Sequence, residues 1–201
     1  MNARIPFIAA PVLTFAYGVI RILDGLDGER GPGLAWTTGH LAFIAAMVMF
    51  LLVFGHLRRL AGRDALSTVT VVVASVGALA LITQFGVDVV AGAIADDHAG
   101  MSEVTRSVKS NPLVSLFAYD LGPYLFYVGQ LVLVVQLAVQ RRIAAWTPLL
   151  VLVDLVMPLV DKDLIPVGAA VLLVSFVSIG RQAARVSEDG RRASSGAVRV
   201  G

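Results

Sequence analysis

Residues 66–95 read LSTVTVVVASVGALALITQFGVDVVAGAIA, and Asp88 is the one charged side chain in this run. A helix needs about 20 predominantly apolar residues to cross a bilayer, so this stretch is long enough to do so. Further apolar runs, separated by charged or Gly/Pro-rich breaks, lie at residues 5–23, 36–57, 112–140, 145–160 and 164–180. The pattern predicts an all-α integral membrane bundle of six transmembrane helices.

The composition also indicates a bilayer environment. Of the 201 residues, 57% are hydrophobic and 15% are charged, which is more apolar than a soluble domain of this length tolerates. We therefore expect one six-helix transmembrane domain at residues 1–180. The first run contains Pro6 and Pro11 and has no clear small-residue cleavage site, so we expect it to be the first span and not a signal peptide.

The basic residues indicate an orientation, because Lys and Arg accumulate in cytoplasmic loops. With six spans, most of them fall on one side: Arg4, Arg58, Arg59, Arg63, Arg141, Arg142, Arg181, Arg185, Arg191, Arg192 and Arg199. Most of the acidic residues fall on the other side. We therefore expect both termini in the cytoplasm (N-in/C-in), a bacterial-type plasma membrane, and a basic, largely disordered cytoplasmic tail at residues 181–201.

Charge and motifs also limit the partners. The basic residues lie at helix ends and not in a patch interleaved with aromatic residues, so we expect the lipid bilayer as a partner and no nucleic acid. The chain has no cysteine, which excludes disulfides and thiolate metal sites. It also has no zinc, P-loop or dinucleotide motif, so we expect no cofactor and no metal.

Two connections on the predicted outer side, 24–35 and 96–111, are long enough to act as lids. The second is expected to carry a short interfacial helix, after which Asn111 caps the fourth span and Pro112 occupies its first turn. The last two spans are joined by Asp161-Lys162-Asp163, three consecutive charges that predict a tight hairpin at the membrane interface.

Polar residues within the spans form stripes at helical spacing. Ionisable groups in a span cost several kcal/mol unless they face protein or water, so the stripes predict a polar cavity. Asp120 and Asp154 lie on antiparallel helices that rise about 1.5 Å per residue, and we expect them at a similar depth in the outer half of the bundle. Asp88 lies at or above that depth. Two carboxylates in one low-dielectric pocket suit proton transfer near neutral pH.

We therefore predict Asp120, Asp154 and Asp88 as catalytic acids or bases. The side chains predicted to contact a substrate are Gln84, His40, Tyr124, Tyr127, Tyr17 and Arg21. A structural interpretation stays open, in which each aspartate pairs with a basic residue, a tyrosine or a backbone amide and only holds helices together. Under it, Arg21 and Asp24 form an interfacial pair and the tyrosines are packing residues. Trp36 and Trp146 are expected to be interfacial anchors.

Three functions fit this pattern. The first is a membrane-embedded enzyme of cyclase or isomerase type, in which an aspartate protonates or deprotonates a lipophilic, isoprenoid- or lipid-like small molecule in a water-poor cavity. The second is a small proton- or cation-coupled transporter. The lack of internal repeats and the apolar inner half weigh against it, although a homodimer could supply what one chain lacks. The third is a non-catalytic membrane accessory subunit whose polar residues specify helix packing.

Overall fold

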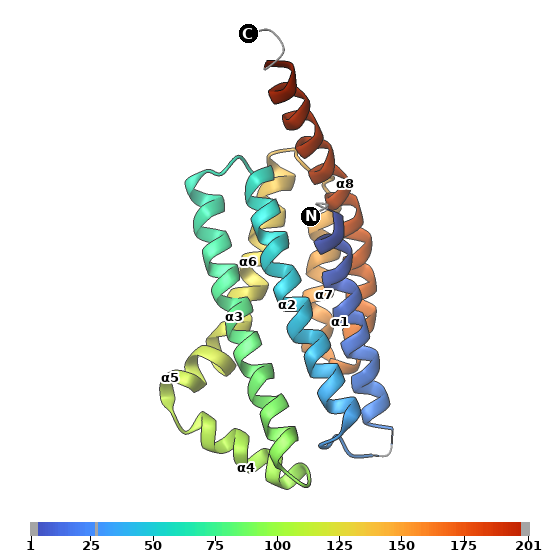
Figure 1. Ribbon diagram of the computed structural model, residues 1–201, viewed down its shortest axis with the longest axis vertical. Helices are drawn as coiled ribbons and strands as arrows, with labels where there is room; N and C mark the ends of the chain where they lie inside the picture. Colours follow the sequence, from blue (N-terminus) through green and yellow to red (C-terminus); the bar gives the residue numbers. More distant parts are fainter. Residues whose placement is uncertain (1–3, 27, 198–201) are drawn as a thin grey trace.

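The computed structural model describes residues 4–26 and 28–197, with side chains described up to Ala184 (Figure 1). Every element in those residues is a helix, which confirms the all-α prediction. In chain order the elements are α1 (Arg4–Asp24), α2 (Leu34–Leu60), α3 (Ala65–Ile94), α4 (His98–Lys109), α5 (Pro112–Val114), the π-helical η1 (Ser115–Leu121), α6 (Gly122–Val139), α7 (Thr147–Val160), the 3-10 turn η2 (Lys162–Leu164) and α8 (Ile165–Ala197).

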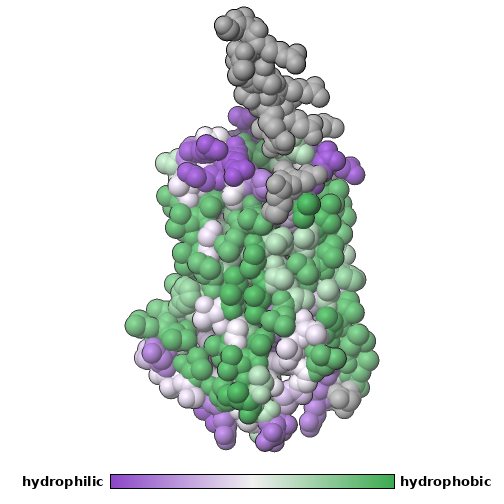
Figure 2. Space-filling view, viewed as in Figure 1, coloured by the Kyte–Doolittle hydropathy of each residue, from purple (hydrophilic) through white to green (hydrophobic). Residues whose placement is uncertain are grey.

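Five helical segments are long and apolar enough to cross a membrane: α1, α2, α3, the continuous segment Pro112–Val139 and the segment Lys162–Ala184. Figure 2 shows the corresponding surface, an apolar band between two polar ends. These features support the predicted multi-pass membrane protein. Helix α7 is apolar but has 14 residues. At 1.5 Å per residue it is roughly 21 Å long, less than the roughly 30 Å hydrocarbon core of a bilayer.

The long helices and α7 form a closed ring in the order α1, α2, α3, α6, α7, α8, in which each helix packs on the next and α8 returns to α1. Helix α2 also contacts α6 and α8 across the ring. The α2–α3 and α6–α7 connections lie at one end of the bundle, and α4 with the α1–α2 and α7–α8 connections lies at the other (Figure 1). We call the first the arginine end, for Arg58, Arg59, Arg63, Arg141 and Arg142, and the second the α4 end.

Side-chain caps set where several helices begin. At the arginine end, Asp64 caps α3 by accepting a hydrogen bond from the Ser67 backbone N–H at 2.6 Å. At the α4 end, Asp97 caps α4 and Asn111 caps α5. The helix predicted within residues 96–111 and the capping role predicted for Asn111 are both present.

Helices α3 and α6 approach so closely that parts of their interface have room only for hydrogen. A Cβ added at Gly77 would overlap the backbone of Phe126, and a Cβ added at Gly129 would lie 2.7 Å from the Ala74 Cβ. Membrane helices favour small residues at such contacts, because their association depends on close van der Waals packing and not on exclusion of water. This seam fixes the distance between α3 and α6.

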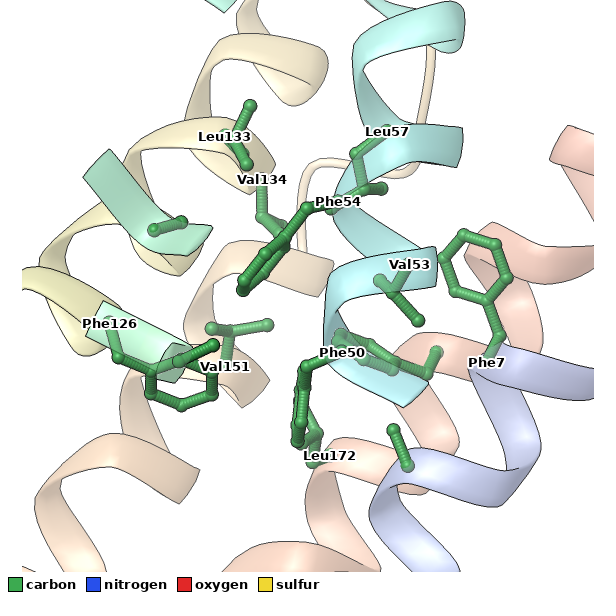
Figure 3. Packing of buried hydrophobic residues seen from close by; sticks show 14 of the residues in the cluster. Phe7, Phe50, Val53, Phe54, Leu57, Phe126, Leu133, Val134, Val151 and Leu172 are labelled. Carbon is green, nitrogen blue, oxygen red and sulfur yellow. The ribbon is translucent and has the colours of Figure 1, made fainter. Parts of the chain in front are cut away.

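Buried aromatic side chains fill the middle of the ring (Figure 3). The Phe50 ring of α2 lies edge-on to Phe126 of α6, with centroids 5.0 Å apart, and Phe7 of α1 lies 5.7 Å from Phe176 of α8. Edge-to-face pairs of this kind add about 0.5–1.5 kcal/mol to the stabilisation from buried area. We call Phe7, Phe50, Phe54, Phe126 and Phe176 the phenylalanine layer; each is at most 3% exposed.

Two boundaries differ from those expected. The predicted span 112–140 is one helical segment, but its first turns contain the π-helical η1. Helix α8 continues to Ala197, past residue 180, where we expected the sixth span to end and the tail to begin. The side chains after Ala184 and residues 198–201 lie outside the described part of the chain, so the disorder of the tail stays a prediction.

Candidate functional site

A cavity of about 590 Å³ lies in the half of the bundle toward the α4 end, and all six helices of the ring contribute to its wall. All but one of the predicted site residues line it: Asp88, Asp154, Gln84, His40, Tyr124, Tyr127, Tyr17 and Arg21. Its deep part is apolar and includes Phe50 and Phe126 of the phenylalanine layer. The structure thus brings these polar residues together, while their catalytic and binding roles stay predictions.

Asp120 is not part of this cavity. It is exposed on η1, and the Ser115 hydroxyl donates a hydrogen bond to its carboxylate at 3.1 Å. The expectation that Asp120 and Asp154 share a pocket is therefore wrong. The physical reason is the π-helical segment, because each extra residue in a turn rotates the following side chains by about 100° relative to an α-helix. Tyr119, one residue earlier, lines the cavity.

His40 of α2 and Asp88 of α3 form a pair at the cavity wall. The His40 Nε2 and Asp88 Oδ2 atoms are 3.8 Å apart, and His40 Nδ1 lies 2.7 Å from the carbonyl oxygen of Trp36. Because a carbonyl oxygen only accepts, we assign the hydrogen of a neutral His40 to Nδ1. Nε2 is then an acceptor that faces Asp88, so the two side chains can hold one mobile proton between them.

Trp36 holds this pair in place. Its indole Nε1 donates to the Asp88 backbone carbonyl at 2.8 Å, and its ring centroid lies 4.0 Å from that of His40. Gly92 leaves room for the indole, because a Cβ there would lie 2.6 Å from Trp36 Cδ1. The prediction that Trp36 is only an interfacial anchor is therefore wrong, whereas Trp146 is 46% exposed, as expected of an anchor.

Asp154 of α7 lies against Gly168 of α8. A Cβ added at Gly168 would lie 3.0 Å from Asp154 Oδ1, so the glycine leaves the carboxylate its space. In the described part of the chain, the Asp154 side chain has no hydrogen-bond or ion-pair partner, and the pairing expected under a structural role is not formed. An unpaired carboxylate within a membrane bundle is costly and is by default a candidate for function.

The mouth of the cavity is held by a charged network. Arg21, expected to pair with Asp24, binds the Asp163 carboxylate instead, and Arg30 Nη2 binds the same carboxylate at 3.0 Å. Arg30 Nε also donates to the Arg21 carbonyl at 3.3 Å, and His98 Nδ1 lies 2.7 Å from the Arg30 carbonyl oxygen. The network therefore ties α1, the α1–α2 connection, α4 and the hairpin before α8 together.

Sequence reasoning gave no site role to Trp36, Arg30, His98 and Lys162, which all line the cavity. Arg30 and His98 belong to the two connections described above as lids, and that position was the available signal. Their side chains reach the cavity because both connections lie over its mouth at the α4 end.

Comparison of the chain with protein-family models, with curated proteins and with solved structures gives no match. Within the described residues, no group of three His, Asp or Glu side chains is arranged to hold a metal ion. The side chains that the cavity offers for chemistry are a histidine–carboxylate pair, an unpaired carboxylate, and phenol groups over an apolar floor.

Proposed function

We propose that the protein is a membrane-embedded enzyme that performs acid/base chemistry on a lipophilic, isoprenoid- or lipid-like substrate in this cavity. The main support is that one cavity carries the His40–Asp88 pair and the unpaired Asp154 beside an apolar floor. Its volume falls within the range of about 300–1,000 Å³ that is typical of small-molecule sites. The apolar part of such a substrate would lie against the floor and its reactive part beside the carboxylates.

The cavity offers two places for proton transfer. A general acid or base must present its proton-bearing atom within reach of the substrate. His40 Nε2, with Asp88 beside it, is one such atom, and the Asp154 carboxyl group is another. A substrate between them gains a proton at one carbon and loses a proton at a second, which is the net requirement of an isomerisation or a cyclisation. Tyr17 and Tyr127 can stabilise positive charge that develops on the way.

The same proposal includes a topology of six crossings with both termini cytoplasmic, in a plasma membrane of bacterial type. Helix α7 runs from the arginine end to the hairpin at the α4 end, as its neighbours in the ring do, although it has only 14 residues. The arginine end has the excess of basic residues that cytoplasmic loops carry. The cavity then faces the outer side.

The transporter alternative has less support. A transporter must connect its site to both sides of the membrane, and the phenylalanine layer fills the ring between the cavity and the arginine end. These rings are at most 3% exposed and pack edge-on, so a path through them requires the helices to separate. A non-catalytic subunit is the interpretation left if the cavity carboxylates prove dispensable.

The test compares Asp88→Asn and Asp154→Asn with Asp120→Asn, the same change at an exposed carboxylate outside the cavity. Membranes that contain each variant are incubated with a total lipid extract, and lipid conversion is followed by mass spectrometry. We expect conversion by the wild type and Asp120→Asn, and a loss of about 100-fold or more in the two cavity variants, because general acid/base groups contribute at least that factor.

Size-exclusion chromatography of each purified variant establishes that it is folded. Full lipid conversion by both cavity variants would overturn the proposal. Proton or cation flux through reconstituted vesicles, lost in the cavity variants and without any lipid conversion, would favour the transporter instead.

A further inference from the structure

A second pocket of about 400 Å³ lies beside the main cavity, under α4. Its wall consists of Trp36, Asp88, His98, Met101, Ser102, Thr105, Arg106 and Lys109. On α4, His98, Ser102, Thr105 and Lys109 follow one another at helical spacing and so share one face. Met101, 4% exposed, anchors α4 to the bundle. The face that α4 turns toward the pocket is thus rich in hydrogen-bond donors.

These donors have no acidic partner. Within the described chain, no carboxylate pairs with Arg106 or Lys109, and no hydrogen bond engages the hydroxyl groups of Ser102 and Thr105. The Lys109 Nζ atom lies 4.9 Å from the centre of the Tyr119 ring. Two cations and two hydroxyl groups around one pocket are the donor set that binds a phosphate group, through charge-assisted hydrogen bonds.

The pocket and the main cavity are neighbours and share three lining residues. Trp36, Asp88 and His98 line both of them. Tyr119 lines the main cavity and lies under the Lys109 ammonium group, and its buried hydroxyl has no hydrogen-bond partner among the described residues. One ligand can therefore place a polar head on α4 and an apolar part in the main cavity. The single acidic side chain of the pocket, Asp88, lies where the two spaces meet.

We infer that the α4 pocket binds the phosphate group of the substrate, so that the substrate class is an amphiphile with a phosphate monoester or diester head and an apolar chain. This inference rests on the proposed function and narrows its substrate. The head binds Arg106, Lys109, Ser102 and Thr105, and the chain extends past Trp36 toward the apolar floor. Binding at α4 then brings the part of the chain next to the head to His40 and Asp88.

The test measures binding without turnover. The purified full chain in a neutral detergent is titrated with short-chain phosphatidic acid, with the matching diacylglycerol, and with inorganic phosphate. We expect phosphatidic acid to bind at least about tenfold more tightly than diacylglycerol. We expect the double variant Arg106→Gln/Lys109→Gln to lose about tenfold or more in its affinity for phosphatidic acid. The reason is that one charge-assisted hydrogen bond changes an affinity by about tenfold.

Two matched variants control for nonspecific charge effects. Arg141→Gln/Arg142→Gln removes two exposed cations at the arginine end and should leave the affinity unchanged. Glu103→Gln removes an acidic group from the exposed face of α4, outside the pocket, and should also leave it unchanged. An equal loss in the Arg141/Arg142 variant would assign the binding to overall charge and overturn the inference.

The remaining outcomes are also decisive. Inorganic phosphate that competes with phosphatidic acid in the wild type, but not in the Arg106/Lys109 variant, supports the site. Inorganic phosphate that binds there while phosphatidic acid does not would support a phosphate site for a soluble ligand and overturn the lipid assignment. Equal affinity for phosphatidic acid and diacylglycerol, with no phosphate binding, overturns the whole inference. Binding as inferred without any lipid conversion would count against the proposed function alone.

Discussion

The Asp64 carboxylate accepts hydrogen bonds from α3 and from the end of α6 at the arginine end. It accepts from the Ser67 backbone N–H, from Gln136 Nε2 at 3.1 Å and 3.2 Å, and from Gln140 Nε2 at 3.4 Å. These bonds hold the pKa of Asp64 below its ordinary value of 3.8, and the bond from the Ser67 backbone has the largest effect. They also join the start of α3 to the end of α6.

A lowered pKa predicts how stability depends on pH. The ionised form of Asp64 stabilises the folded protein at pH values above the ordinary pKa, and this contribution is lost as pH falls through the lower pKa of the folded state. We expect the wild type to have a higher melting temperature than Asp64→Asn at pH 7. The difference should shrink below about pH 4. Asparagine keeps one oxygen for the cap, so the part of the difference that changes with pH reports the charge.

Melting curves of the purified protein in detergent, recorded from pH 7 to pH 3, measure this difference. Asp64→Ala, which removes the cap as well as the charge, should melt lower than Asp64→Asn throughout. A gap between the wild type and Asp64→Asn of the same size at both ends of the pH range would show that the charge does not contribute.

For single residues, the sequence predicts which side chains line the cavity but not which of them form hydrogen bonds with one another. Helical spacing placed Gln84, Asp88, Tyr124 and Tyr127 on faces that line one cavity, because phase along a regular helix follows from residue number alone. Trp36 was misassigned, because its hydrogen bond to the Asp88 carbonyl joins two helices and depends on their distance. The sequence of α2 alone does not predict the distance between α2 and α3.

At the scale of helices, the glycine seam between α3 and α6 makes a sharp prediction. Gly77→Ala adds one methyl group that would overlap the Phe126 backbone, whereas Gly86→Ala adds the same group on the same helix with nothing within 4 Å. Overpacking a well-packed interior costs about 1–3 kcal/mol and sometimes more, so Gly77→Ala should lower the free energy of unfolding by about 1–3 kcal/mol or more. Gly86→Ala should be neutral or raise it by up to about 1 kcal/mol, because alanine is the better helix former.

Denaturation of both variants in mixed micelles measures the contrast. Because Gln84 and Asp88 lie on α3 and Tyr124 and Tyr127 lie on α6, a wider seam also changes the cavity they line. Equal stability of Gly77→Ala and Gly86→Ala would mean that the helices separate without cost, and the seam would then not fix the cavity.

The boundaries of the helices were predictable where the chain carries a local signal. Asn111 with Pro112 marks a helix start, and the three charges Asp161-Lys162-Asp163 mark a hairpin; both lie where expected. The π-helical η1 has no such signal, because its extra residue is accommodated by packing on α3 and α6. The error at Asp120 follows from that one insertion, since the predicted face of Asp120 assumed a regular α-helix.

At the scale of the whole molecule, the length of the helices does not decide whether α7 crosses the membrane. The arrangement of the ring gives a testable answer. The Arg21 and Arg30 side chains bind Asp163, so the hairpin lies at the same end as the α1–α2 connection. If α1 crosses the membrane, α7 must return the chain to that end. The proposal that α7 is a crossing therefore rests on these tertiary contacts and not on its 14 residues.

The absence of cysteine allows a direct test of this topology, because a single introduced cysteine is the only reactive thiol. Ala99 of α4 and Ala145 of the α6–α7 connection are both exposed, and Ala→Cys at each is a matched pair. With an N-in/C-in arrangement of six crossings, a membrane-impermeant maleimide added to intact spheroplasts should label Ala99→Cys and not Ala145→Cys. After permeabilisation both should react.

A third reporter, Lys162→Cys, isolates α7, because it lies on the exposed hairpin that α7 reaches. It should react from outside together with Ala99→Cys. Labelling of Ala145→Cys and protection of the other two would invert the orientation and turn the cavity toward the cytoplasm. Labelling of Ala145→Cys and Lys162→Cys from the same side would remove α7 from the crossings, and the ring could then not be a transmembrane unit as a whole. Because the proposed chemistry needs a cavity closed by six helices, the position of this one short helix bears directly on it.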